Sequence, residues 1–391
     1  MNIYEEALKL HEENKGKIEV ISKSKVKDMH DLAVVYTPGV AEPCRKIHEK
    51  TSDVYKYTSK GNMVAVVSDG TAVLGLGDIG PEAALPVMEG KAVLFKHFAN
   101  VDAFPICLAT KDPDKIVEAV TLIAPSFGGI NLEDISAPRC FEIEDRLKKI
   151  LNIPVFHDDQ HGTAIVVLSG LINALKVVHK EIDKINVVVN GAGASAIAVL
   201  KFLMSAGVKH AILCDSKGII YEGRKENMNP IKETMSKVTN REKMKGTLAD
   251  AIKGADVFLG LSAADVLKAE MVKTMAPDSI IFAMANPTPE IMPDVAKKAG
   301  ARIVCTGRSD FPNQVNNCLG FPAIFKGALK VRASQINEKM KLAAAHALAS
   351  LISDDELNDD NVIANAFDPR VVERESEAVA KAAIESGVAR I

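Results

Sequence analysis

Short apolar runs alternate with helix-patterned segments along most of the chain, and this alternation constrains the fold more than any other feature. Four such runs, NMVAVVS, DAFPICL, GGINL and NIPVFH, occur before residue 160, with helical patterns between them. Strands that alternate with helices form parallel sheets, with the connecting helices packed on the sheet faces. The sequence therefore predicts an α/β fold. A chain of 391 residues also exceeds the usual size of a single core, which predicts two domains.

We place the domain boundary near residue 160. Residues 1–160 are predicted to form an N-terminal α/β domain with a parallel sheet. Residues 161–391 are predicted to form a doubly wound, Rossmann-like domain, because five further apolar runs each end in small or polar residues: INVVVNG, KHAILCD, ADVFLG, SIIFAMA and ARIVCTG. Two helical stretches are expected to make a C-terminal tail from about residue 327 to 391. The segment YTPGVAEPC is rich in Pro and Gly, so we expect it to lack regular structure.

Composition argues for a small-molecule partner. The net charge is only -3 and the pI is near 6.3, so no global positive field attracts nucleic acid or an anionic membrane. The chain has no apolar run of about 18 residues, and its charged N-terminus lacks the apolar segment of a secretory signal. Its six cysteines form no C-x-x-C pair. We therefore expect a cytoplasmic protein that binds neither nucleic acid nor membrane.

A glycine-rich turn opens the second predicted domain. It forms a G-x-G-x-x-A pattern between an apolar strand and a helix, and Asp215 closes the next strand, where a ribose hydroxyl is usually held. The pattern predicts a dinucleotide site, with the pyrophosphate at the helix N-terminus; the alternative is a tight turn used only in packing. Asp215 favours NAD because its charge would repel a 2'-phosphate, although Lys217 leaves NADP possible. The predicted cofactor-binding turn comprises Gly191, Ala192, Gly193, Ala194, Ser195 and Ala196.

Two acidic doublets follow predicted strands of the first domain. Glu133 and Asp134 end GGINLED, while Asp158 and Asp159 end NIPVFHDD. Sites in open parallel sheets form beyond the carboxyl ends of the strands, so the doublets are expected to share one site. Carboxylates suit Mg2+ or Mn2+. Both members of a doublet can bind one ion only if the strand has already ended; the alternative is that these acids cap helices or form salt bridges.

Four other side chains near these segments are candidates for chemistry. His157 and His161 flank the second doublet, but imidazole suits Mg2+ and Mn2+ poorly. Lys91 lies in a predicted helix and Tyr36 in the Pro-Gly segment. Near a divalent cation the pKa of a lysine falls, so Lys91 is a candidate base. Without a cation nearby, a lysine in a helix is usually a solvated surface charge, and a tyrosine in a Pro-Gly loop usually serves only in packing.

Eight motifs stand in the order and spacing found in malic enzymes: YTPGVA, VSDGTAVLGLGDIG, MEGKA, GGINLEDI, FHDDQHGTA, NGAGA, ANPTPE and TGRSDFPNQVNN. Over nearly its whole length the chain resembles the short prokaryotic type of that family. The resemblance implies oxidative decarboxylation of L-malate to pyruvate and CO2, with reduction of NAD, or of NADP as the alternative, and a requirement for Mg2+ or Mn2+. It also implies that oxaloacetate is a possible second substrate for decarboxylation.

The resemblance also implies roles for particular residues. Tyr36 would be the general acid and Lys91 the general base, with Asp158 supporting the lysine. Larger eukaryotic members carry an arginine for the substrate carboxylate where this chain has Ala72, so that carboxylate must be bound differently here. The implied metal ligands are Glu133, Asp134 and Asp159, the implied cofactor contacts are Asn286 and Asn316, and the implied substrate contact is Asn317.

Two other functions fit parts of the sequence. A hydroxy-acid or amino-acid dehydrogenase that does not decarboxylate would need the dinucleotide turn but no metal, and a non-enzymatic NAD sensor would need only the second domain. The acidic doublets argue against both. Dehydrogenases of this build commonly form symmetric dimers or tetramers, so we expect a homo-oligomer, in which a neighbouring subunit is a possible source of Tyr36.

Overall fold

The first sheet has four parallel strands in the order β2-β1-β3-β4. The computed structural model describes residues 2–391. The strands and their covering helices are β1 (Met63–Ser68), α5 (Pro81–Ala99), β2 (Asp102–Cys107), α6 (Pro113–Ile123), β3 (Gly129–Leu132), α7 (Arg139–Ile150) and β4 (Val155–His157). β1, β3 and β4 are almost wholly buried, as expected for strands covered on both faces, whereas β2 at the edge of the sheet is half-buried.

The second sheet has six strands in the order β10-β9-β8-β5-β6-β7, and only β7 runs antiparallel. The order of the strands reverses at β5, which has β6 on one side and β8 on the other, and a ligand crevice is expected beyond the carboxyl end of such a switch point. The predicted α/β fold is confirmed. The elements are β5 (Asn186–Asn190), α9 (Ala194–Ser205), β6 (His210–Asp215), β7 (Gly218–Ile219), α10 (Pro230–Val238), α11 (Leu248–Ala251), β8 (Val257–Gly260), α12 (Ala269–Val272), β9 (Ile280–Ala283), α13 (Pro293–Lys298) and β10 (Ile303–Thr306).

The helix α8 (Asp158–Val177) joins the two sheets. Most of its side chains are buried, as the sequence predicts for a connecting helix with apolar residues on nearly every face. One continuous core contains Val64 of the first sheet, Ile165 of α8 and Val187 of the second sheet. The predicted domain boundary near residue 160 falls in the first turn of α8, and the division itself stays a prediction.

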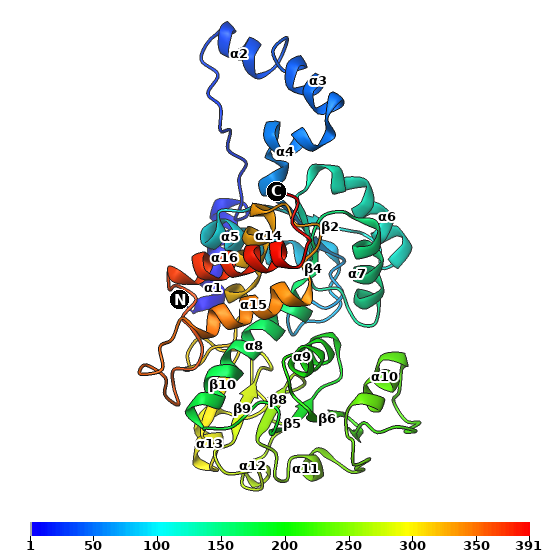
Figure 1. Cartoon of the computed structure of the whole chain (residues 1–391), viewed down its shortest axis with the longest axis vertical. Helices are drawn as coiled ribbons and strands as arrows, with labels where there is room; N and C mark the ends of the chain where they lie inside the picture. The colour runs from blue at the N-terminus through cyan, green and yellow to red at the C-terminus, as the bar shows by residue number, and fades with distance from the viewer. Residues whose placement is uncertain (1) are drawn as a thin grey trace.

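Three C-terminal helices return toward the first sheet (Figure 1). They are α14 (Phe321–Lys330), α15 (Glu338–Ala349) and α16 (Arg370–Glu385). α14 packs against α5, α15 packs against α8, and α16 packs against α14 and α15. The ring of Phe95 on α5 lies 4.7 Å from that of Phe321 and 5.4 Å from that of Phe325. Edge-to-face packing of these rings fixes α14 on α5. The segment just before α14 is therefore held close to the middle of α5.

The N-terminal region forms an arm. Its helices are α1 (Ile3–Asn14), α2 (Met29–Val35), α3 (Ala41–Glu49) and α4 (Val54–Tyr57), and α2 and α3 project away from the rest of the molecule (Figure 1). Short 3-10 helices span Thr51–Asp53, Ser59–Asn62, Ala124–Ser126 and Asn317–Leu319. None of the helices described within residues 2–391 is both long and apolar enough to cross a lipid bilayer.

The prediction that YTPGVAEPC lacks regular structure is wrong for its second half, which begins α3 at Ala41. Pro43 lies in the first turn of this helix, where a backbone N–H would have no partner within the helix anyway, so the proline is tolerated. Tyr36 does lie outside the helices, immediately after the last residue of α2.

Candidate active site

The register of the first sheet brings the two acidic doublets to the same edge. Leu132 of β3 is paired with His157 of β4, so the next residue on each strand, Glu133 or Asp158, lies beside the other. Asp134 has a φ of 54°, in the left-handed region, which turns the chain away from the strand direction. The strand has therefore ended at this point, so both Glu133 and Asp134 can face one ion. The second doublet instead starts α8.

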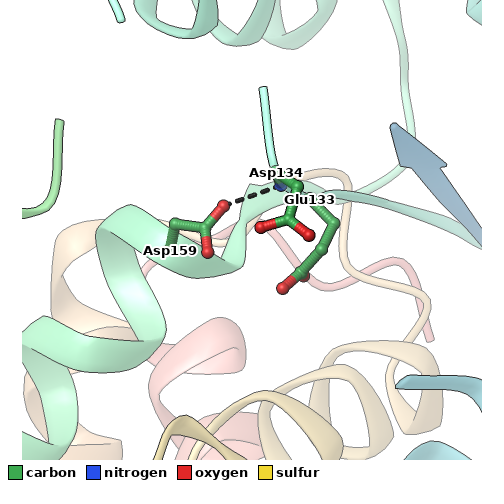
Figure 2. A group of neighbouring side chains, drawn as sticks. All are labelled: Glu133, Asp134 and Asp159. Carbon is green, nitrogen blue, oxygen red and sulfur yellow. Dashed lines mark hydrogen bonds between the residues drawn. The ribbon is translucent and has the colours of Figure 1, made fainter. Parts of the chain in front are cut away.

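Three carboxylates converge on one small space (Figure 2). One oxygen from each of Glu133, Asp134 and Asp159 lies within 4.8 Å of the others. The backbone N–H of Asp134 donates to Oδ2 of Asp159 at 2.8 Å, which holds the two segments together. Within the described chain, Oδ2 of Asp134 is buried and has no hydrogen-bond partner. Burial, together with the charges of Asp159 and Glu133, raises the pKa of Asp134 to about 9.

This arrangement fits a hard divalent cation. All the converging atoms are carboxylate oxygens, which Mg2+ and Mn2+ prefer. A cation would satisfy the unpartnered oxygen of Asp134 and would offset the repulsion among like charges in a buried place. The ligand set implied by the family resemblance is thus brought together in space.

Lys91 lies beside this cluster and is buried, with only 7% of its surface exposed. Its Nζ is 2.7 Å from Oδ2 of Asp158 and 2.9 Å from Oε1 of Glu133, and it lies 4.3 Å from the centre of the Phe321 ring. Burial by itself would lower the pKa of Lys91, but the charges of Asp158 and Glu133 outweigh it and raise the pKa. Lys91 is therefore a paired internal ammonium group rather than a solvated surface charge.

Asp158 is fully buried and links Lys91 to the second half of the chain. Its Oδ2 also accepts a hydrogen bond from Nδ2 of Asn317, which lies just before α14. Burial raises the pKa of Asp158 to about 7, against the opposing charge of Lys91. A Cβ atom at Gly162 would lie 2.0 Å from Oδ1 of Asp158, so glycine is needed there for this carboxylate to fit. Sequence reasoning missed Gly162, although its spacing of one helical turn from Asp158 is visible in HDDQHG.

The two histidines near the acids have different surroundings, and Nδ1 of His157 lies 3.7 Å from Oδ2 of Asp159. Nε2 of His161 lies 2.8 Å from Oε1 of Glu144, and its Nδ1 lies 3.3 Å from Nζ of Lys341. Burial lowers the pKa of His161 to about 4. His157 is fully buried, and among the described residues neither of its ring nitrogens has a hydrogen-bond partner. Neither histidine belongs to the converging group of potential ligands.

The glycine-rich turn lies beyond the carboxyl end of β5, at the switch point of the second sheet. Gly191 has a φ of 122°, and a Cβ there would lie 2.2 Å from the carbonyl oxygen of Leu261. Gly193 precedes α9, has open space where a Cβ would point, and leaves the helix without a side-chain cap. The first N–H groups of α9 are thus available to an anion, as pyrophosphate binding requires. Ala196 packs into the core, while Ala192, Ala194 and Ser195 are partly exposed.

A cavity of about 720 Å³ adjoins this turn and is lined on one side by Asp215. Asp215 lies at the end of β6, as the sequence predicts. Its carboxylate is bound by the side chains of Arg224, Asn227 and Lys232, contacts that sequence reasoning missed. The only available signal was the run of basic residues after Asp215 in DSKGIIYEGRKENMNPIK.

The predicted asparagine contacts lie where the two halves of the chain meet. A Cβ atom added to Gly75 would lie 3.3 Å from the carbonyl oxygen of Asn286. A Cβ atom added to Gly307 would lie 2.6 Å from the side-chain amide nitrogen of Asn286. Oδ1 of Asn316 accepts from the backbone N–H of Cys318 at 3.0 Å, which positions the neighbouring Asn317 against Asp158. These residues border both the acidic cluster and the second sheet.

Tyr36 is the one predicted catalytic residue that the fold does not bring to this place. It is 67% exposed and directly follows α2, a helix of the projecting arm that lies far from α8 in Figure 1. Within one chain the structure therefore assembles Lys91, the acids and Asn317, but not the tyrosine.

A Rossmann-like sheet with an open glycine-rich turn, together with a buried lysine and an acidic cluster that fits a divalent cation, places the protein in the class of dinucleotide-dependent oxidoreductases. Two family models divide the chain between them. The malic enzyme N-terminal domain matches residues 15–148, and the malic enzyme NAD binding domain matches residues 160–385. The chain belongs to the malic enzyme family, as its motifs predict.

Relatives with similar sequences carry names from this family. A bifunctional malic/malolactic enzyme of Bacillus subtilis is 63% identical over 391 residues, covering 100% of this chain and 95% of that protein. An NAD-dependent malic enzyme of Geobacillus stearothermophilus is 59% identical, covering 96% of this chain and 78% of that protein. An NADP-dependent malic enzyme of Escherichia coli is 52% identical, covering 96% of this chain and 51% of that protein.

Solved structures of the family share the fold. The malic enzyme of Pyrococcus horikoshii superposes with a TM-score of 0.95 at 51% identity, covering 100% of this chain and 92% of that one. The NAD-dependent malic enzyme of Thermotoga maritima gives a TM-score of 0.93 at 50% identity, covering 96% of this chain and 98% of that one. The relatives named here include both NAD-dependent and NADP-dependent enzymes, so family membership alone does not select the cofactor.

Proposed function

We propose that this protein catalyses the oxidative decarboxylation of L-malate to pyruvate and CO2, with reduction of NAD or NADP. The observation that carries the proposal is the buried Lys91, held by Asp158 and Glu133 at the edge of the carboxylate cluster. A simple dehydrogenase or a nucleotide sensor has no use for this constellation. The names of the relatives support the same reaction.

The positions of the side chains suggest a role for each of them in the reaction. Lys91 takes the proton of the C2 hydroxyl while the C2 hydride passes to the nicotinamide. Asp158 orients Lys91, and Asn317 in turn holds Asp158 by donating to the same carboxylate oxygen. When the C4 carboxylate leaves as CO2, its bonding electron pair remains on the three-carbon product, and Tyr36 donates the proton that C3 then takes.

Glu133, Asp134 and Asp159 would hold Mg2+ or Mn2+ beside Lys91. Such an ion supplies Lewis-acid polarisation of the substrate oxygen and stabilises negative charge there. A cation bound to Glu133 would also weaken one of the two interactions that keep the proton on Lys91, which would make the neutral amine easier to reach.

The direct test follows absorbance of the reduced nicotinamide with L-malate and either NAD or NADP, in Mn2+ or in EDTA, while pyruvate is measured separately. We expect reduction that requires Mn2+ and yields equal amounts of pyruvate. Reduction without pyruvate would indicate a dehydrogenase that does not decarboxylate. No reduction with either nucleotide, despite binding of both, would favour the sensor.

We also propose that the protein acts as a homo-oligomer in which Tyr36 reaches the site of a second copy of the chain. Among the described residues, α1 to α4 contain no buried side chain. The arm exposes a series of large apolar side chains that a monomer would leave in water: Ile18, Val20, Ile21, Val26, Met29, Leu32, Val34, Val35 and Val40.

All six cysteines are free thiols, which fits action in the reducing cytoplasm.

Complementation tests the shared site. Tyr36→Phe and Lys91→Ala are each expected to lose malate oxidation when purified alone. Co-expressed with different tags and isolated as mixed oligomers, the two variants should regain part of the activity, because one of the two mixed sites then contains both native residues. Mixed oligomers that stay inactive would show that Tyr36 and Lys91 do not act across the interface, and a monomeric mass in light scattering would refute the assembly itself.

A further inference from the structure

The buried carboxylate of Glu290 joins two loops of the second sheet. Its Oε1 accepts from the backbone N–H of Ser262 at 2.9 Å, and its Oε2 accepts from the backbone N–H of Ala285 at 3.0 Å. Ser262 lies just beyond β8 and Ala285 just beyond β9, so one side chain ties together the loops at the carboxyl ends of two neighbouring strands. A Cβ atom added to Gly260 would lie 2.4 Å from Cδ of Glu290, so glycine is needed there to admit the carboxylate.

Glu290 is a buried acid without a cationic partner. Its side chain is fully buried, and within residues 2–391 it forms hydrogen bonds but no salt bridge. Each of its oxygens accepts a backbone N–H, which suits the ionised form, because a carboxylic acid would carry a proton on one of them. Burial raises the pKa of Glu290, and the N–H groups of Ala285 and Ser262 oppose that shift. Little water surrounds this charge, so its field is screened weakly in the neighbouring cavity.

The two loops that Glu290 joins border the reactive end of the dinucleotide cavity. Ser262 lines that cavity, as does Asp215 at the end of β6, on the other side of β5. Ala285 directly precedes Asn286, whose carbonyl oxygen lies close to Gly75 in the segment between β1 and α5. A dinucleotide with its ribose at β6 that crosses the switch point therefore has its nicotinamide half over β8 and β9, on the side where Gly75 approaches.

We propose that Glu290 is a positioning residue whose unpaired negative charge favours the oxidised, positively charged nicotinamide over the reduced, neutral one. Glu290 touches neither cofactor nor substrate. It fixes the loops after β8 and β9 and acts on the nicotinamide through its field. The inference rests on the proposed function, because it assumes that the cavity beside the glycine-rich turn binds a dinucleotide. Hydride transfer neutralises the ring, so the attraction assists loading of the oxidised form and is absent when the reduced form leaves.

The test measures binding and needs no turnover. The full-length protein is titrated calorimetrically at pH 8 with the oxidised and the reduced form of NAD or NADP, whichever nucleotide wild type binds more tightly. At an effective dielectric constant of about 20, opposite unit charges roughly 15 Å apart change a binding constant by about sixfold. Glu290→Gln keeps the size of the side chain and removes the charge. It should weaken the oxidised form relative to the reduced form by about threefold or more.

Two further variants separate the charge from the hydrogen bonds. Glu290→Asp keeps the charge, but its shorter side chain cannot reach both backbone N–H groups. It should weaken the oxidised and reduced forms in proportion and leave the ratio of the two affinities unchanged. Glu270 lies on α12 and is 81% exposed, so Glu270→Gln removes a solvated acid of the same domain and should alter neither affinity.

An unchanged ratio of affinities in Glu290→Gln would overturn the role of the charge. Wild-type affinities in Glu290→Asp would overturn the positioning role, and this arm of the test stands even if Glu290→Gln fails to fold. Failure of wild type to bind either form of NAD or NADP would instead remove the dinucleotide site on which the proposed function depends.

Discussion

Replacing Asp134 by asparagine should remove a pH dependence from the stability of the metal-free protein. Asp134 has two acidic neighbours, and its Oδ2 is buried without a hydrogen-bond partner among the described residues. Its pKa is raised from 3.8 to about 9 when no cation is present. Between these two values the folded protein binds a proton that the unfolded chain does not bind. The free energy of unfolding therefore falls as pH rises through this window.

The size of the effect follows from the linkage relation and from the distances. A group that is protonated only in the folded state lowers the free energy of unfolding by about 1.4 kcal/mol per pH unit, or roughly 3 kcal/mol between pH 6 and 8. Coulomb repulsion between two carboxylate oxygens 4.8 Å apart gives a similar figure, about 3.5 kcal/mol at an effective dielectric constant of 20. For domains of this size, that corresponds to a shift of roughly 5–10 °C in melting temperature.

The assay is thermal unfolding of wild type and Asp134→Asn in EDTA from pH 6 to 8, repeated for wild type in Mn2+. We expect the melting temperature of wild type in EDTA to fall more steeply with pH than that of Asp134→Asn. Mn2+ should flatten the wild-type curve and leave the variant nearly unchanged. Asp145→Asn makes the same substitution at an exposed position in the first domain and serves as the control. Equal pH slopes for wild type and Asp134→Asn would refute the reasoning.

Three further predictions test the two halves of the site and the C-terminal helices. Lys91→Ala should lower the rate of malate oxidation by about 10²–10⁴-fold while NADH still binds, as measured by nicotinamide fluorescence. Gly191→Ala should lower the melting temperature, because the added Cβ would lie 2.2 Å from the carbonyl oxygen of Leu261. Gly193→Ala should leave the melting temperature unchanged, because its Cβ would point into open space, but it should weaken NADH binding. Glu375 is buried, both its carboxylate oxygens lack partners within the described chain, and burial raises its pKa. The free energy of unfolding of wild type should therefore fall as pH rises above 4.5. Glu375→Met should raise the melting temperature, and by more at pH 8 than at pH 5.

Sequence reasoning worked best where local pattern and sheet topology fix a side chain. Glu133 and Asp158 follow neighbouring parallel strands, so their approach follows from strand order once those strands are recognised. The dinucleotide turn was equally accessible, because a glycine with positive φ and a helix N-terminus both leave local signals. The position of Asn317 against Asp158 depends on α14 packing onto α5, a contact between distant parts of the chain that no local pattern encodes.

Residues outside regular spacing were harder to place. Arg224 and Lys232 reach Asp215 from a loop and from α10, nine and seventeen positions further along the chain. No helical or strand period links such positions, so their partnership appears only in three dimensions. The error at α3 has a different cause. The prediction for YTPGVAEPC assumes that proline and glycine break regular structure, whereas proline in a first helical turn is compatible with the helix.

The acidic cluster and the dinucleotide turn are connected by packed helices rather than by a flexible linker. Asp158 and Asp159 lie in the first turn of α8, where the helix dipole favours negative charge. α8 packs along α9, whose N-terminus carries the glycine-rich turn, and both helices belong to one continuous core. Any motion that separated the acidic cluster from the glycine-rich turn would have to disturb this buried contact. Because the core holds the two groups of residues together, core substitutions between α8 and α9 should alter turnover even though they lie outside both groups.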